Sequence, residues 1–167
     1  MIFKSRRTFL KNSFLTSIIF ITCSGELFGA VTPMQTISLV QKDLFPDTAN
    51  TPKSDDINAY YYLHTILNHS RITDQSKDFI RNGAKWLNEE SVEKYKKVYT
   101  KLSSRQRQDI LQTVAQSGWG DNWIRTVMTY ILEAMLGDPI YGGNKNQSGW
   151  KWLNHKSGLP RPIKAVL

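Results

Sequence analysis

Between residues 32 and 136, apolar side chains recur at the three-to-four-residue spacing of amphipathic helices. From Met34 to Leu44 they occupy positions 34, 37, 39, 40 and 44. Thr32-Pro33 is a typical helix start, and Phe45-Pro46-Asp47 is expected to end the helix. No segment combines two-residue alternation with the β-branched residues of a strand. The pattern therefore predicts an all-α protein.

The same spacing, together with capping residues, predicts the remaining helices. Asp55 or Asp56 is expected to cap a helix that extends through Asn68, and the predicted inward side chains are Ile57, Tyr60, Tyr61, Leu63, His64 and Leu67. Further helices are expected from Thr73-Asp74, across Glu89 to Tyr99, from Ser103 or Ser104, and from about Asn122 to Leu136. The prediction is a small bundle of five or six helices with one core.

Beyond Leu136 the helical periodicity stops. The next residues are rich in glycine, asparagine and aromatic side chains, which predicts an irregular segment with positive-φ turns. Its aromatic rings allow two interpretations: rigid anchors for a partner protein, or side chains that fold back and lock the segment onto the helices. The partner-binding candidates are Asp138, Pro139, Tyr141, Gly142, Gly143, Asn144, Gly149 and Trp150.

Composition narrows the class of protein. Apolar residues make up 40% and charged residues 22% of the 167-residue chain, so collagen-like and wholly disordered proteins are excluded. The formal net charge is +8, but residues 1–30 carry four basic residues against one acidic residue. The remainder is only mildly basic, and we expect no nucleic-acid partner.

The usual signatures of cofactor binding and catalysis are absent from the sequence. Cys23 is the only cysteine, so no disulfide, Cys-x-x-Cys metal pair or haem attachment site can form within the chain. His64 and His69 would point about 140° apart on a helix, which disfavours a shared metal. Gly142-Gly143 follows a predicted helix rather than a strand, unlike a dinucleotide-binding turn. The sequence therefore predicts no catalytic, cofactor-binding or metal-binding residue in this chain.

The amino terminus has the plan of an export signal. Residues 5–11 read Ser-Arg-Arg-Thr-Phe-Leu-Lys, and an uncharged apolar run from Phe14 to Cys23 follows. That run is shorter than the ~20 residues of a membrane-spanning helix. The sequence resembles a twin-arginine signal, with Arg6, Arg7, Phe9 and Leu10 as the residues that the translocase would read. We predict a signal at residues 1–30 and a single helical domain at 31–167.

Processing of this signal is open to more than one interpretation. Gly29-Ala30 offers small residues for cleavage, but Phe28 does not fit the third position before the cut. Cys23 could carry a lipid, although the residues before it fit that modification poorly. An incidental apolar thiol is the favoured interpretation.

Taken together, these features resemble the gluconate 2-dehydrogenase subunit 3 family, the small or gamma subunits of periplasmic, membrane-bound sugar and sugar-acid dehydrogenases. The most specific markers are Asp-Pro-x-Tyr-Gly-Gly-Asn at residues 138–144 and Gly149-Trp150. Leu44-Phe45-Pro46 and the segment from Gly83 to Leu87 add to the resemblance, which covers nearly the whole chain.

The resemblance implies a non-catalytic subunit of an oxidoreductase complex. In that family the large subunit contains FAD, and a multihaem cytochrome c often carries electrons onward. The large subunit commonly lacks a signal of its own and is exported with the small one. We therefore expect this chain to support export, maturation or stability of a flavoprotein in the periplasm, with peripheral membrane association through the complex.

Two other classes of function stay open on the sequence alone. The chain could be an independent periplasmic helical domain that binds a ligand or has a structural role, or it could be an enzyme in its own right. Co-purification distinguishes the first alternative from the accessory subunit, because only the accessory subunit requires a stoichiometric flavoprotein partner. A flavin absorbance scan of the isolated chain tests the second.

Overall fold

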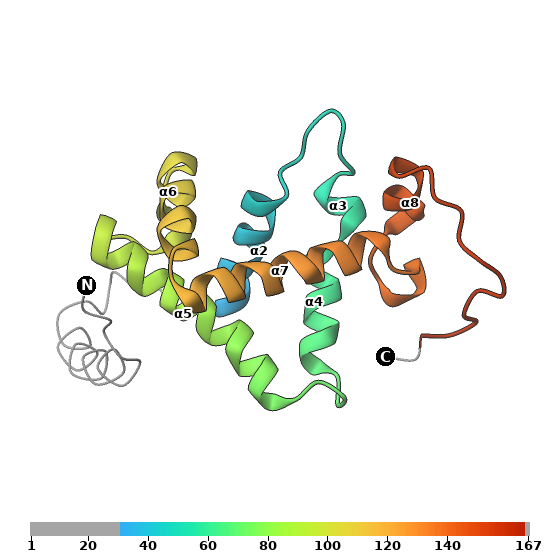
Figure 1. Cartoon of the computed structure of the whole chain (residues 1–167), viewed down its shortest axis with the longest axis horizontal. Helices are drawn as coiled ribbons and strands as arrows, with labels where there is room; N and C mark the ends of the chain where they lie inside the picture. The colour runs from blue at the N-terminus through green and yellow to red at the C-terminus, as the bar shows by residue number, and fades with distance from the viewer. Residues whose placement is uncertain (1–30, 166–167) are drawn as a thin grey trace. The chain divides into compact units, whose positions relative to one another are not determined.

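The computed structural model describes residues 31–165, and within this range it contains helices and no strand (Figure 1). The α-helices are α2 (Pro33–Leu44), α3 (Ser54–Ile57), α4 (Ala59–Asn68), α5 (Asp74–Tyr95), α6 (Ser104–Ala115), α7 (Gly118–Leu136) and α8 (Ser148–Trp152). Three short 3-10 turns are η1 (Tyr99–Lys101), η2 (Pro139–Tyr141) and η3 (Lys145–Gln147). The predicted all-α class is confirmed, and the predicted export signal lies outside the described residues.

Helix α7 is the centre of the helical domain, because it packs against α2, α3, α4, α5, α6 and α8. Figure 1 shows α7 running across the other helices. Its inner face buries Trp123, Val127 and Ile131 almost completely. The Trp123 indole donates a hydrogen bond to the Ile80 carbonyl (3.0 Å), and its ring occupies the space where a side chain on Gly83 would lie. Gly83 therefore permits the close packing of α5 on α7.

A buried polar network joins α2 to η1 and α6. Arg107 forms a two-point ion pair with Asp43, with Nε–Oδ2 and Nη2–Oδ1 distances of 2.7 and 2.9 Å. The Tyr99 hydroxyl donates to the same carboxylate (2.7 Å), and burial with this hydrogen bond raises the pKa of Tyr99 well above its usual range. Because each group has a partner, the network avoids the cost of unpaired buried charge.

Several predicted helix starts are confirmed in detail. Thr32 caps α2 and Ser103 caps α6, each through a reciprocal capping box with the glutamine three residues later. Thr73 caps α5 through the Ser76 N–H. Helix α2 ends at Leu44, the predicted residue, just before Phe45-Pro46. These boundaries depend on short-range hydrogen bonds, which sequence patterns reveal well.

The single helix predicted from Asp55 or Asp56 through Asn68 is wrong. Asn58 adopts a left-handed conformation (φ 55°) and separates α3 from α4. The predicted inward residues Ile57, Leu63 and Leu67 are buried, and so is Ile66. The predicted inward residues Tyr60, Tyr61 and His64 are exposed instead.

Two other boundaries differ from the prediction. The separate helix expected across Glu89 to Tyr99 is instead the end of α5, which continues unbroken to Tyr95. Ser91 is fully buried there and bonds back to the Leu87 carbonyl (2.7 Å), so its polar side chain does not interrupt the helix. Helix α7 begins at Gly118 rather than near Asn122, because Ser117 caps it through the Gly120 N–H.

The Asp43–Arg107 pair supplies a test of the fold. Arg107→Ala leaves the Asp43 carboxylate without its cation, and that side chain is only 9% exposed. We expect a loss of about 3–5 kcal/mol in the free energy of unfolding. The matched control is Arg125→Ala, because Arg125 pairs with Asp121 at the surface and is 76% exposed. That change is expected to cost less than about 1 kcal/mol. Equal losses in urea denaturation of the two variants would contradict the assignment.

Candidate functional site

The C-terminal segment, defined here as residues 137–155, folds back over the end of α7. The last carbonyl groups of a helix lack partners within the helix and must find them elsewhere. In this protein the Trp150 indole N–H donates to the Leu136 carbonyl (2.6 Å), and the Asn144 side-chain amide donates to the Gly137 carbonyl (2.9 Å). The segment is therefore a C-terminal cap for the central helix.

Asn144 holds this cap together. Its side chain is fully buried, and its backbone is left-handed (φ 45°). Besides donating to Gly137, its side-chain carbonyl accepts from the Gly149 N–H (2.9 Å), and its backbone N–H donates to the Ile57 carbonyl (3.2 Å). The Asn144 side chain thus joins the end of α7 to the start of α8, and its backbone N–H adds a bond to the end of α3.

The glycines of the segment are required by close packing. A Cβ atom on Gly143 would clash with the Ala134 carbonyl, and one on Gly149 would clash with the Met135 carbonyl. Gly142 has a positive φ of 88°, and a Cβ atom there would overlap the Tyr61 ring. Each glycine allows the segment to approach α7 or α4 more closely than any other residue type would.

Asn58, between α3 and α4, makes a second connection to the segment. Its side-chain amide donates to the Gly142 carbonyl at 2.6 Å. Because the side chain is used in this way, it does not cap the first turn of α4. Together with the bond from Asn144 to Ile57, this contact fixes the α3–α4 junction against the C-terminal segment.

Asp138 closes the segment at its outer edge. Its carboxylate accepts from the Ile140 N–H (3.0 Å) and pairs with Arg161 through two hydrogen bonds of 2.9 and 3.0 Å. The Arg161 bonds, and then the Ile140 N–H, lower the pKa of Asp138 below its ordinary value. The guanidinium of Arg161 also lies 5.3 Å from the centre of the Trp150 ring.

All eight predicted partner-binding residues belong to this one segment, but they do not form one exposed surface. Trp150 is only 6% exposed, which supports the interpretation that it folds back onto the helices. Asn144, Gly143 and Gly149 are buried as well, whereas Tyr141 is half-buried. The specific part of the motif therefore builds the segment, and other residues provide its outer surface.

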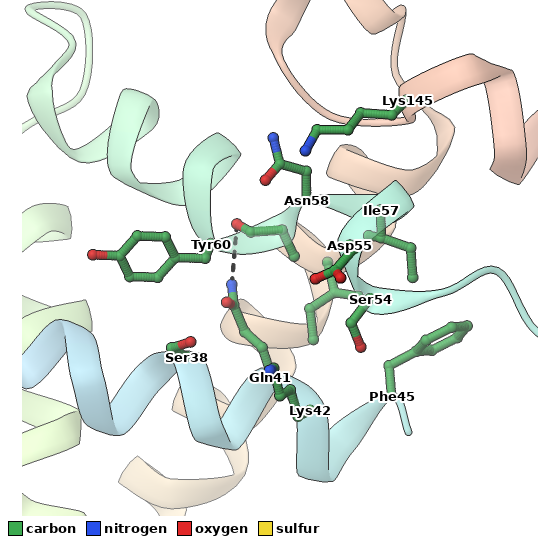
Figure 2. Close-up of a pocket in the computed structure, with 12 residues that line it drawn as sticks. Ser38, Gln41, Lys42, Phe45, Ser54, Asp55, Ile57, Asn58, Tyr60 and Lys145 are labelled. Carbon is green, nitrogen blue, oxygen red and sulfur yellow. Dashed lines mark hydrogen bonds between the residues drawn. The ribbon is translucent and has the colours of Figure 1, made fainter. Parts of the chain in front are cut away.

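A pocket of about 470 Å³ lies beside the segment and was not foreseen from the sequence (Figure 2). It lies where α2, the α3–α4 junction and η3 come together, and Figure 2 shows Gln41 and Lys145 reaching it from α2 and η3. Phe45, which begins the predicted helix stop, lines one side. No local sequence pattern indicates this pocket, because its residues are far apart in the chain.

The described residues contain no group of three or more His, Cys, Asp or Glu side chains placed to hold a metal ion. No helix within residues 31–165 is both long enough and apolar enough to cross a membrane. The only buried side-chain atom without a hydrogen-bond partner in this range is the Ser148 hydroxyl. The arrangement is that of a tightly bonded structural segment next to an open polar pocket.

The fold and the segment define a small all-helical domain whose central helix is closed by an Asp-Pro-x-Tyr-Gly-Gly-Asn and Gly-Trp cap. Residues 32–158 match the family described as gluconate 2-dehydrogenase subunit 3. Since the match covers well over half of the chain, the protein belongs to this family, as its motifs suggested. No curated protein and no solved structure matched the chain.

Trp150 tests the role of the cap. Trp150→Ala removes a buried ring and the bond to Leu136, and we expect a loss of about 3–5 kcal/mol in the free energy of unfolding. Trp150→Phe keeps most of the ring but loses the donor, with an expected loss of about 1–3 kcal/mol. The control is Trp152→Ala, since Trp152 is 44% exposed. This change should alter stability by no more than about 0.5 kcal/mol. Wild-type stability of Trp150→Ala would refute the capping role.

The Asp138–Arg161 pair predicts a pH dependence. The folded protein lowers the pKa of Asp138 from its ordinary value of 3.8, so the carboxylate stabilises the fold above that pH. This contribution is lost as the pH falls through the lower, folded-state pKa. The melting temperature of wild type should therefore exceed that of Asp138→Asn at about pH 7, and the difference should shrink towards about pH 3. A difference that stays constant with pH would contradict the ion pair.

Proposed function

We propose that this chain is the non-catalytic small subunit of a periplasmic, FAD-dependent dehydrogenase of the gluconate 2-dehydrogenase kind. The observation that carries the proposal is the family match over residues 32–158. A family described as a subunit implies a dehydrogenase complex. In this proposal the flavin belongs to the large subunit, haem belongs to a c-type cytochrome subunit where one is present, and this chain supplies binding surface.

The way the motif is used supports an accessory role. The polar groups of the family's most specific residues are engaged in internal hydrogen bonds, as shown for Asp138, Asn144 and Trp150. A catalytic acid, base or nucleophile needs access to a substrate. Residues bonded in this way instead fix the shape of a surface, which is what a subunit needs in order to hold a partner.

The proposal includes export of this chain together with the flavoprotein. The Arg6-Arg7 signal would direct the chain to the twin-arginine translocase, which transports folded cargo. A signal of this type on a chain without an evident cofactor makes physical sense if a folded flavoprotein travels with it. The complex would then reside in the periplasm and associate peripherally with the membrane through its other subunits.

The test is export of the flavoprotein large subunit that this proposal assigns to the complex, when it and this chain are produced together. The double variant Arg6→Lys, Arg7→Lys keeps the charge but loses the planar guanidinium groups. We expect both proteins to stay in the cytoplasm, with periplasmic dehydrogenase activity falling to background. The control is Lys4→Arg, a conservative change beside the arginine pair that should leave export unchanged.

Two outcomes would contradict the proposal in different ways. Normal export of the double-lysine variant would show that the chain does not use the twin-arginine route. The accessory role would be contradicted by two results together. These are export of an active flavoprotein in cells that lack this chain, and failure of the two proteins to co-purify from cells that contain both. This pair of results would favour an independent periplasmic binding or structural domain.

A further inference from the structure

The pocket beside the C-terminal segment is lined by both apolar and polar residues. The lining includes the buried apolar residues Ile57 and Ile131 and the polar residues Ser38, Gln41, Lys42, Asn58 and Lys145. Figure 2 shows these groups coming from α2, the α3–α4 junction and η3. Its volume of about 470 Å³ is within the usual range for a binding site.

Gln41 leaves a hydrogen-bond acceptor unused in this pocket. The residue is only 6% exposed, and its Nε2 donates to the Ala59 carbonyl at 3.2 Å, as the dashed line in Figure 2 shows. Within residues 31–165, no group donates to its Oε1 atom. Because this oxygen is not among the buried atoms without a partner, it is accessible from the pocket. An N–H or O–H group entering the pocket would satisfy it.

The same pocket favours negative charge. Helix α4 begins here, and its first turn has no side-chain cap because Asn58 bonds to Gly142 instead. The amino end of a helix carries partial positive charge. Lys42 from α2 and Lys145 from η3 add two cations, against Asp55 as the one acidic side chain of the lining.

Aromatic rings lie on two sides of the pocket. Tyr60 lines it and is 45% exposed, and Phe45 on the other side contacts Trp152 edge-to-face, with ring centres 6.3 Å apart. In the described part of the chain, the large exposed apolar residues lie on α4, the end of α7 and the residues after α7, and none lies on α5 or α6. Aromatic side chains of this kind dominate protein–protein binding energies.

We propose that this pocket and its rim, formed by Phe45, Tyr60 and Trp152, are the docking site for the dehydrogenase large subunit. A loop of that subunit would place an Asp or Glu side chain between Lys42 and Lys145, and one of its N–H groups would donate to Gln41 Oε1. A protein loop fits better than a small molecule, because small-molecule sites usually enclose most of the ligand. This inference rests on the proposed function.

The basic residues of the pocket, Lys42 and Lys145, and the basic composition of the chain after Asp138 support an acidic partner loop. After Asp138 the chain carries five basic residues and no acidic one, and Lys145 is the first of them. Charge of one sign on an interface increases the rate of association with an oppositely charged partner, and salt weakens this effect. Binding through this surface should therefore weaken as ionic strength rises.

The experiment measures the affinity of the purified full chain for the separately purified flavoprotein. Lys145→Glu and Trp152→Ala are each expected to raise the Kd by about tenfold or more, as for interface hot spots. Lys145→Arg keeps the charge and should bind as wild type does. The matched control is Lys97→Glu, because Lys97 is an exposed lysine between α5 and η1. This control should leave the Kd unchanged, and all four variants should melt as wild type does.

The outcomes separate this inference from the proposed function. If wild type binds the flavoprotein and Lys145→Glu and Trp152→Ala bind equally well, the docking site is elsewhere and the accessory role stands. If Lys97→Glu weakens binding as much as Lys145→Glu, the effect is one of overall charge and the inference is overturned. If wild type does not bind the flavoprotein at all, the proposed function itself fails.

Discussion

The structure depends on which groups donate hydrogen bonds to the backbone carbonyls at the carboxyl end of α7. This helix touches nearly every other helix of the domain, so its last carbonyl groups lie where an unmet hydrogen bond would be costly. Trp150 donates to the last of them, at Leu136, and Asn144 donates to the carbonyl of Gly137, the residue that follows the helix. The glycines between and beside these residues let the backbone come close enough for both bonds to form. These hydrogen bonds hold an irregular, glycine-rich segment against the end of α7.

The same cap has consequences away from α7. Because the segment is fixed, the Gly142 carbonyl can accept a hydrogen bond from the Asn58 side-chain amide. The Asn58 side chain is then not available to cap the first turn of α4. The segment also carries Lys145 to the edge of the pocket. The family's motif and the pocket are therefore physically linked, because buried motif residues determine the position of exposed ones such as Lys145. This division suits the accessory role proposed above, in which exposed residues would contact the partner.

Sequence patterns predicted the parts of this structure that depend on short-range bonds. The capping residues Thr32 and Ser103 and the irregular segment after Leu136 are examples. The break at Asn58 was missed because its left-handed conformation is stabilised by Gly142, which is distant in the chain. The pocket was missed for the same reason. Trp150 was recognised as important, but only its bond to Leu136 shows that its role is internal.

The central claim is that Asn144 couples the end of α7 to the α3–α4 junction, and amide hydrogen exchange on Asn144→Ala tests it most directly. Asn146→Ala is the matched control, because Asn146 is an exposed, left-handed asparagine two residues away. In Asn144→Ala we expect the backbone amides of residue 144, of Gly149 and of the start of α4 to exchange faster than in wild type. The amides of α5 and α6 should keep their protection from exchange. The control should resemble wild type. Equal protection in both variants, or uniform loss across all helices, would contradict the account.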